Sequence, residues 1–294
     1  MRKTVVLKSV AKSLIPFLPV ARRLKRRILP YQDNLGNSRL ALANGLQMIR
    51  LLRSVDANIR GDILEVGSGW LPVIPLLFHL CGARRVVMTD IERLMDAQTI
   101  ERARRLIGED LGPVARELGL DEAEAADKLR SGFQPDYVVP WDSARHPAGS
   151  VDIVVSRAVL EHVPPPAIEA WTADFSRILR PGGVICHFID NSDHWEHQDK
   201  SLSRVDFLRY EDGLFWRMAC RETQAYQNRL RHGDYLALFR RHGWTAVVDD
   251  GVPDEKCLRD LQTLPLASTF RGHEPRDLAI LTSVFVLRRT SEVS

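Results

Sequence analysis

Asp62-Ile-Leu-Glu-Val-Gly-Ser-Gly-Trp-Leu71 is the stretch of sequence that decides the fold. It joins a short apolar run, residues 63–66, to a glycine turn and then to the start of a helical segment. Gly67 and Gly69 allow a sharp backbone turn, and they let a ligand approach main-chain N–H groups with no Cβ in the way. Glu65 lies near the carboxyl end of the predicted strand, which is the edge where open α/β sheets bind ligands. The stretch therefore predicts a strand, a turn and a helix that together hold a ligand.

A second predicted strand, residues 85–89, ends in an acid, Asp90, about 20 residues after the turn. An acid at this spacing can accept hydrogen bonds from the hydroxyl groups of a ribose. A dinucleotide site needs a third glycine so that pyrophosphate can lie against the helix N-terminus, but Pro72 occupies that position. The negative charge of Glu65 would also repel pyrophosphate, whereas it suits a ligand that carries an ammonium or sulfonium group. The pattern favours S-adenosylmethionine over NAD.

Composition indicates one α/β core with additions, because the chain has 294 residues and 45% of them are hydrophobic. The net charge is only +3, which does not indicate a nucleic-acid partner. The four cysteines are widely spaced, so we expect free thiols in a reducing cytoplasm and no disulfide framework. No segment approaches the roughly 20 uninterrupted apolar residues of a membrane span. These features predict a cytoplasmic protein.

The N-terminal residues 1–37 are predicted to form a basic arm that precedes the main domain. Residues 1–30 contain nine lysines and arginines and no acid. Such an arm is either solvated or in peripheral contact with a membrane surface, and the solvated arm is favoured. Residues 38–294 then form the main domain, with predicted inserts near 108–134 and 191–230.

Strands and helices alternate along the main domain, which predicts a doubly wound, mostly parallel sheet. The later strands are expected at residues 136–139, 150–156, 184–189, 244–249 and 278–287. The helices are expected at residues 38–52, 71–80, 91–107, 167–179 and 234–241. Asp234 is expected to be the N-cap of the last helix, and residues 180–183 are expected to form a turn. No clear crossover helix separates the last two strands, so the final strand is predicted to be antiparallel.

These segments together resemble the class I S-adenosylmethionine-dependent methyltransferases, including the type 11 group, over roughly residues 60–290. The resemblance is carried by Leu64-Glu-Val-Gly-Ser-Gly69, Asp90, Val151-Asp-Ile-Val-Val-Ser156, Val159-Leu-Glu-His-Val163 and Leu179-Arg-Pro-Gly-Gly183. It implies a Rossmann-like methyltransferase fold with seven strands, and S-adenosylmethionine as the cofactor. The chain also resembles, more weakly, methyltransferases that modify bacterial surface glycans or secondary metabolites.

The resemblance also implies which residues bind the cofactor. Glu65, Gly67 and Gly69 would surround the methionine part of S-adenosylmethionine, and Asp90 would hold the ribose. Ile91 would pack on the adenine and Asp142 would contact the adenine amino group. Ser156 and Arg157 would lie beside the methyl group, with Arg157 close to the methyl acceptor.

The loop after the fifth predicted strand contains the candidate base. An alcohol or phenol acceptor needs a base to remove its proton, whereas an unprotonated amine needs only correct placement. His194 can supply that base together with an acid, either Asp190 or Asp193. We therefore predict O-methylation of a small molecule or a saccharide, with His194 and Asp193 as the catalytic residues. The alternatives are an N-methyltransferase, which would tolerate loss of His194, and a non-catalytic subunit that binds S-adenosylmethionine.

The predicted lid contains aromatic and basic residues that suit a polar acceptor. Tyr226, Asn228 and Arg229 are the candidate contacts. His162 and His187 are predicted to be structural, and His194, His197 and Cys186 lack the spacing of a metal site, so no metal is predicted. Nucleic acid is not an expected acceptor, because Ser156-Arg-Ala-Val159 stands where an asparagine-proline-proline-aromatic motif would be.

Overall fold

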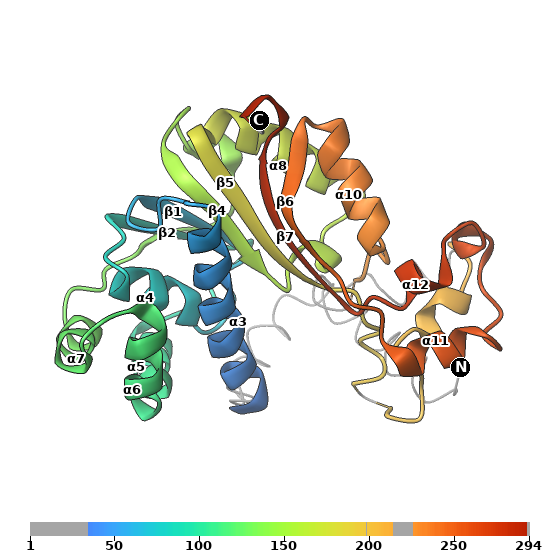
Figure 1. Cartoon of the computed structure of the whole chain (residues 1–294), viewed down its shortest axis with the longest axis horizontal. Helices are drawn as coiled ribbons and strands as arrows, with labels where there is room; N and C mark the ends of the chain where they lie inside the picture. Colours follow the sequence, from blue (N-terminus) through green and yellow to red (C-terminus); the bar gives the residue numbers. More distant parts are fainter. Residues whose placement is uncertain (1–34, 198, 214–225, 293–294) are drawn as a thin grey trace, which may run out of the picture.

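A seven-stranded sheet forms the centre of the computed structural model, which describes residues 35–197, 199–213 and 226–292 (Figure 1). The strands are β1 (Asp62–Val66), β2 (Arg85–Thr89), β3 (Asp136–Val138), β4 (Val151–Arg157), β5 (Leu179–Asp190), β6 (Trp244–Asp250) and β7 (Thr282–Arg289). Their order is β3-β2-β1-β4-β5-β7-β6. The first five strands pair in parallel, whereas β7 runs antiparallel to both β5 and β6. The predicted doubly wound sheet with an antiparallel last strand is confirmed.

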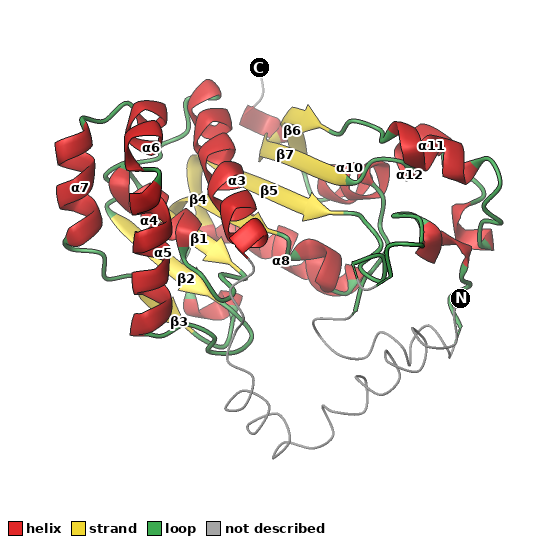
Figure 2. Cartoon of the chain, turned by 90° about the horizontal axis from the view of Figure 1, so that it is seen from below, coloured by secondary structure: helices red, strands yellow, loops and turns green. Residues whose placement is uncertain are grey.

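Helices cover both faces of the sheet (Figure 2). They are α3 (Leu35–Ser54), α4 (Val73–Leu80), α5 (Ala97–Glu109), α6 (Leu111–Leu118), α7 (Glu122–Arg130), α8 (Pro165–Ile178), α10 (His232–Arg241), α11 (Glu255–Leu261) and α12 (Pro275–Leu278). Helices α3, α4 and α5 pack on one face, and α8 and α10 pack on the other. None of the helices in the described ranges is long and apolar enough to cross a membrane.

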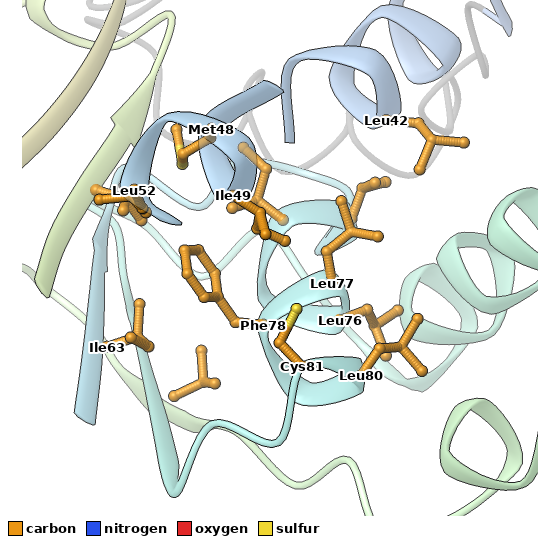
Figure 3. Packing of buried hydrophobic residues seen from close by; sticks show 14 of the residues in the cluster. Leu42, Met48, Ile49, Leu52, Ile63, Leu76, Leu77, Phe78, Leu80 and Cys81 are labelled. Atoms are coloured by element: carbon orange, nitrogen blue, oxygen red, sulfur yellow. The ribbon is translucent and has the colours of Figure 1, made fainter. Parts of the chain in front are cut away.

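Two hydrophobic cores lie on the two faces, because successive residues of each strand point to opposite sides. In β1, Ile63 belongs to the core beneath α3 and α4, and Leu64 belongs to the core beneath α8 and α10. Figure 3 shows Phe78 of α4 reaching toward Ile49 and Leu52 of α3. All of these side chains are fully buried, and each such burial contributes about 1.5–3 kcal/mol. These two cores fix the positions of the strand ends that carry the site.

Three element boundaries differ from the sequence prediction. Helix α3 begins at Leu35, so residues 35–37 belong to it and not to the basic arm, whose residues 1–34 lie outside the described part of the chain. Helix α5 begins at Ala97, because residues 91–96 form a loop around the side chain of Asp90. The predicted turn at residues 180–183 is instead the first part of β5.

Two differences concern the C-terminal part of the chain. Strand β7 begins at Thr282, because the preceding residues Pro275–Leu278 form α12. Asp234 is the third residue of α10 and not its N-cap, although its carboxylate still accepts a hydrogen bond of 2.9 Å from the amide of Arg231. Three of the cysteines, Cys81, Cys186 and Cys257, are free and buried, whereas Cys220 lies outside the described residues.

A separate lobe lies beyond the carboxyl end of β5. It contains residues 191–213, apart from residue 198, together with residues 252–281, and it has its own hydrophobic core around Trp195, Phe207 and Phe270. Figure 1 shows α11 and α12 in this lobe, away from the helices that flank β1 and β2. The two segments enter side by side, because the amide of Asn191 donates to the carbonyl of Leu281 at 2.9 Å. The predicted insert after β5 therefore packs against a second segment that the sequence does not associate with it.

Candidate active site

The glycine turn after β1 is closed on one side and open on the other. Gly67 has φ +73°, and a Cβ there would lie 2.4 Å from Cγ2 of Val159, so only glycine fits between the turn and the loop after β4. Gly69 has φ +64°, and no atom lies within 4 Å of the position of its Cβ. Its amide donates to Oδ2 of Asp90 at 2.9 Å. The turn thus has the open backbone that the sequence predicts for a ligand site.

Glu65 places a buried carboxyl group in this turn, and one of its oxygens has no hydrogen-bond partner among the described residues. The residue is 5% exposed, and this oxygen is Oε2. Burial raises the pKa of Glu65 to about 7, and the negative charge of Asp90 raises it further. A cationic ligand would stabilise the ionised carboxylate. S-adenosylmethionine carries an ammonium and a sulfonium group, so this buried carboxyl fits the predicted cofactor.

The loops after β2 and β3 lie side by side at the same edge. The amide of Trp141 donates to the carbonyl of Asp90 at 2.7 Å, which brings Asp142 near Asp90. The carboxylate of Asp90 accepts the amide of Ile91 at 2.7 Å, and the carboxylate of Asp142 accepts the amide of Ala144 at 3.0 Å. Ile91 is 53% exposed, an apolar surface of the kind that an adenine ring covers. The structure therefore gathers Asp90, Ile91 and Asp142, and their contacts with the cofactor stay predictions.

Ser156 and Arg157 end β4 and point to opposite faces of the sheet. The hydroxyl of Ser156 lies 2.8 Å from Nδ1 of His187, and both residues are buried. Burial lowers the pKa of His187 to about 3, which agrees with its predicted role in the core. Nε of Arg157 donates to Oδ1 of Asn44 in α3 at 2.8 Å. The side chain of Ser156 is thus engaged within the sheet, and its predicted place beside the methyl group stays untested.

Two histidines and two carboxylates meet where β4 and β5 end. We call Glu161, His162, Asp190 and His194 the histidine–carboxylate cluster. Nε2 of His194 lies 3.4 Å from Oδ2 of Asp190, and Nε2 of His162 lies 3.9 Å from Oε1 of Glu161. The two imidazole rings have centroids 5.0 Å apart. The cluster thus gathers four ionisable groups at the carboxyl edge.

The surroundings of the cluster shift its pKa values in different directions. Burial raises the pKa of Glu161 well above its usual range, and the charge of Asp190 adds to this shift. Burial also lowers the pKa of His162 to about 4, helped by the charge of His194. Burial acts to raise the pKa of Asp190, but the close approach of the His194 imidazole and hydrogen bonds from Ser192 outweigh it and hold that pKa below its usual range. Asp190 is therefore the ionised carboxylate of the cluster, as a partner of a histidine base should be.

Asp193 lies apart from the cluster. It is fully buried, and its Oδ1 atom accepts the amide of Trp195 at 2.8 Å, which holds the turn that starts the lobe. Burial raises the pKa of Asp193 to about 7, and Asp206 adds to the shift. Of the two acids that the sequence offers as partners for His194, the structure places Asp190 against the imidazole.

The segment that contains the predicted acceptor contacts packs across the loop after β4. These contacts are Tyr226, Asn228 and Arg229. The side-chain amide of Asn228 donates to the carbonyls of Leu160 and Val163, at 2.7 and 2.9 Å. Arg229 is 4% exposed, and its guanidinium pairs with the carboxylate of Asp212. These contacts show a structural role for Asn228 and Arg229, and a contact of either residue with the acceptor stays a prediction.

Glu161 and His162 join His194 in the structure, although the sequence presents them as part of a structural motif. The signal that could have found them is the parallel pairing of Arg157 in β4 with Phe188 in β5. Because parallel strands end at the same edge, the residues that follow these two strands must come together. The Leu-Glu-His segment and the Asp190–His194 loop are those residues.

The sequence model of a family described as "Methyltransferase domain" matches residues 21–247. No curated protein matches the chain significantly. Solved structures with a similar fold include an S-adenosylmethionine-dependent methyltransferase from Mesorhizobium loti, at 14% identity, covering 82% of this chain and 96% of that chain, with a TM-score of 0.46.

Two further structures are a magnesium protoporphyrin IX methyltransferase from Synechocystis with bound S-adenosylhomocysteine and a geranyl diphosphate methyltransferase in complex with S-adenosylmethionine. The first is 13% identical, covers 96% of this chain and 99% of that chain, and has a TM-score of 0.47. The second is 15% identical, covers 83% and 85%, and has a TM-score of 0.46. The family match spans well over half of the chain, so the protein belongs to the methyltransferase-domain family and is a class I methyltransferase that uses S-adenosylmethionine.

Proposed function

We propose that the protein transfers the methyl group of S-adenosylmethionine to a hydroxyl oxygen of a small molecule or a saccharide, with His194 as the base and Asp190 as its partner. The observation that carries this proposal is the 3.4 Å approach of His194 Nε2 to Asp190 Oδ2 at the carboxyl end of β5. An ionised carboxylate beside an imidazole orients the ring and stabilises its protonated form.

The proposed reaction is an in-line displacement at the methyl carbon. The acceptor oxygen forms a bond to that carbon while the bond from carbon to sulfur breaks, and sulfur keeps the electron pair. The hydroxyl proton passes to the imidazole of His194. S-adenosylhomocysteine and a methyl ether are the products, so charge and atoms balance.

The electrostatic charge of the site and the limited exposure of His194 support a small-molecule or saccharide acceptor. Asp190 is ionised at this edge, and a cationic cofactor would ionise Glu65 as well, so the negative charge disfavours a polyanion such as nucleic acid. The side chain of His194 is only 22% exposed, which suits a single hydroxyl group on a slender acceptor. Contact of the basic arm with a membrane, the less favoured alternative for that arm, would favour a lipid-linked glycan, and residues 1–34 lie outside the described part of the chain.

Screening of candidate acceptors with S-adenosylmethionine labelled in its methyl group tests the proposal. With the acceptor found, we expect His194→Gln to lower kcat by about 10²–10⁴-fold, because the base is lost, and to leave S-adenosylmethionine binding unchanged. Asp193→Asn is the matched control: it removes the charge of the other acid and should change kcat far less than Asp190→Asn. Full activity of His194→Gln would favour the alternative, an N-methyltransferase. Cofactor binding without turnover on any acceptor would favour a non-catalytic subunit.

A further inference from the structure

Glu161, His162 and His194 have the composition and the proximity of a metal site. Each offers one nitrogen or oxygen ligand atom, and these three atoms all lie within 4.8 Å of one another. Ligand atoms on a tetrahedral zinc ion lie about 3.3 Å apart, since each bond is about 2.0–2.2 Å long. Small rotations of the side chains would therefore bring all three atoms onto one ion. Two imidazoles and one carboxylate also leave a fourth position open for an oxygen of another molecule.

His162 is already held in the tautomer that a metal requires. Its Nδ1 atom lies 2.8 Å from the carbonyl of Tyr226, and a carbonyl can only accept a hydrogen bond. The proton therefore sits on Nδ1, and Nε2 carries a free electron pair. Ligating histidines are commonly fixed in this way, with the second ring nitrogen donating to a backbone carbonyl. The Nε2 atom that remains faces Glu161.

Glu161 has no hydrogen-bond partner for either oxygen within the described ranges, and the residue is only 3% exposed. Its Oε1 atom and Nε2 of His162 present electron pairs to each other at 3.9 Å. A proton on Glu161 cannot bridge that distance, because a hydrogen bond between such atoms needs about 3 Å. A cation that binds both atoms would satisfy them.

Asp190 supplies an outer partner for the third ligand. It faces Nε2 of His194 at 3.4 Å, and the hydroxyl and amide of Ser192 hold its Oδ1 atom at 2.6 and 2.9 Å. A carboxylate that faces the ring nitrogen which does not bind the metal is the usual outer support of a histidine ligand, so Nδ1 of His194 would be the ligand atom. The histidine–carboxylate cluster thus contains three ligands and one residue that orients a ligand.

The three ligands adjoin the methyl-donor site. Val159, two residues before Glu161, packs against Gly67 of the glycine turn, where any side chain would clash with it. An ion held by Glu161 would therefore lie beside the cofactor pocket.

We infer that Glu161, His162 and His194 bind a divalent transition-metal ion of the Zn²⁺ class, and that its open position takes the acceptor hydroxyl. This inference rests on the proposed function. A hydroxyl bound to such an ion loses its proton more easily, because the ion stabilises the alkoxide. In the metal-loaded protein, His194 is a ligand and the proton leaves to solvent; His194 serves as the base only in the metal-free protein.

Metal binding to the full-length, untagged chain is the first test, and it needs neither cofactor nor acceptor. We expect one Zn²⁺ per chain in competition with a chromophoric chelator. Co²⁺ should give the visible absorption of a tetrahedral or five-coordinate ion. A wild-type chain that binds neither metal more tightly than the chelator does would overturn the inference.

Variants then locate the ion. Glu161→Gln and His162→Gln should each weaken Zn²⁺ binding at least about 100-fold, and Asp190→Asn about 10–100-fold, the range for outer partners. His197→Gln is the matched control, because its ring stacks on His194 with centroids 5.1 Å apart but is not one of the three ligands. Thermal unfolding without metal checks that each variant folds, and the Co²⁺ spectrum of the wild type remains informative if one does not. Equal Zn²⁺ affinity in Glu161→Gln and the wild type would overturn the assignment.

Assays of methyl transfer with and without bound metal distinguish failure of the metal site from failure of the proposed function. If the chelator-treated protein regains O-methylation with Zn²⁺ or Co²⁺ in step with the bound metal, the metal site and the reaction both stand, and His194 acts as a ligand and not as the base. Full O-methylation activity in a protein that binds no metal would support the proposed function and would contradict the proposed metal site. Tight metal binding by the three ligands, with methylation found only at nitrogen, would support the metal site and would contradict the proposal that the acceptor atom is a hydroxyl oxygen.

Discussion

At the scale of single residues, Glu65 links pH to cofactor binding. Its pKa of about 7 means that the carboxyl is largely protonated at pH 6 and largely ionised at pH 7.5. The positive charges of S-adenosylmethionine favour the ionised form, so a proton must leave when the cofactor binds at low pH. We expect binding to be roughly eightfold weaker at pH 6 than at pH 7.5, as measured by calorimetry at both pH values.

Glu65→Gln is the control, because glutamine has the same shape and no titration in this range. Its affinity for S-adenosylmethionine should be lower at pH 7.5 and nearly flat between the two pH values. The same raised pKa means that the folded state holds a proton that the unfolded state has lost between about pH 4.5 and 7. Glu65 therefore lowers stability as the pH rises through this window. A pH slope that survives in the glutamine variant would assign the effect to another group.

At the scale of elements, the start of α5 depends on one cap. Asp96 accepts the amide of Thr99 at 3.0 Å, and the hydroxyl of Thr99 accepts the amide of Asp96 at 3.0 Å. We expect Asp96→Ala to lower the free energy of unfolding by about 1 kcal/mol, measured by urea denaturation. Asp110→Ala is the matched control, because Asp110 precedes α6 without a side-chain cap. This substitution should lower the free energy of unfolding by only a few tenths of the Asp96→Ala loss. Equal losses in both variants would argue against the cap.

The same helix shows what the sequence can and cannot predict about elements. Every strand was located within a few residues, except the start of β5, because buried apolar runs mark parallel strands. The start of α5 was missed because the amides of Ile91 and Leu94 bond to Asp90 and to the hydroxyl of Tyr137. The second of these partners is 43 residues away in the chain. Local periodicity carries no information about such a partner.

The site divides in the same way. The glycine turn and Asp90 come from one continuous strand-turn-helix unit and the strand after it, so their spacing alone predicts them. The histidine–carboxylate cluster joins residues from two loops that meet only when β4 and β5 pair. Asp193 is adjacent to His194 in sequence and Asp190 is four residues away, and only the fold shows that Asp193 turns into the lobe while Asp190 faces the imidazole.

At the scale of the whole molecule, the amino edge of the sheet holds an ion-pair network that lies opposite the active site. Arg180 bonds to Asp62 at 2.7 Å and to Asp152 at 2.5 Å, and thus ties β5 to β1 and β4. We expect Arg180→Gln to lower the free energy of unfolding at pH 7 by about 1–3 kcal/mol, because two largely buried carboxylates lose a partner. Urea denaturation at pH 7 and at pH 3 measures this.

The loss should shrink in acid. Hydrogen bonds from Arg84 and then from Arg180 hold the pKa of Asp62 below its ordinary value of 3.8. A depressed pKa contributes stability above the unfolded pKa, and this stability disappears as the pH falls below 3.8 through the folded pKa. Arg241→Gln breaks a surface pair with Glu169 and should change stability by less than about 0.5 kcal/mol at either pH. An Arg180→Gln deficit that is equally large in acid would contradict the network.

The lobe beyond β5 has a consequence for the order in which a newly made chain can mature on the ribosome. Strands β1 to β5 emerge first, and they can pair with one another before the rest of the chain has been synthesised. Residues 191–213 cannot complete their packing at that stage, because most of the buried residues in their hydrophobic core belong to residues 252–281. His194 belongs to the first of these segments. The glycine turn that binds the cofactor can therefore fold on the nascent chain before the histidine–carboxylate cluster assembles.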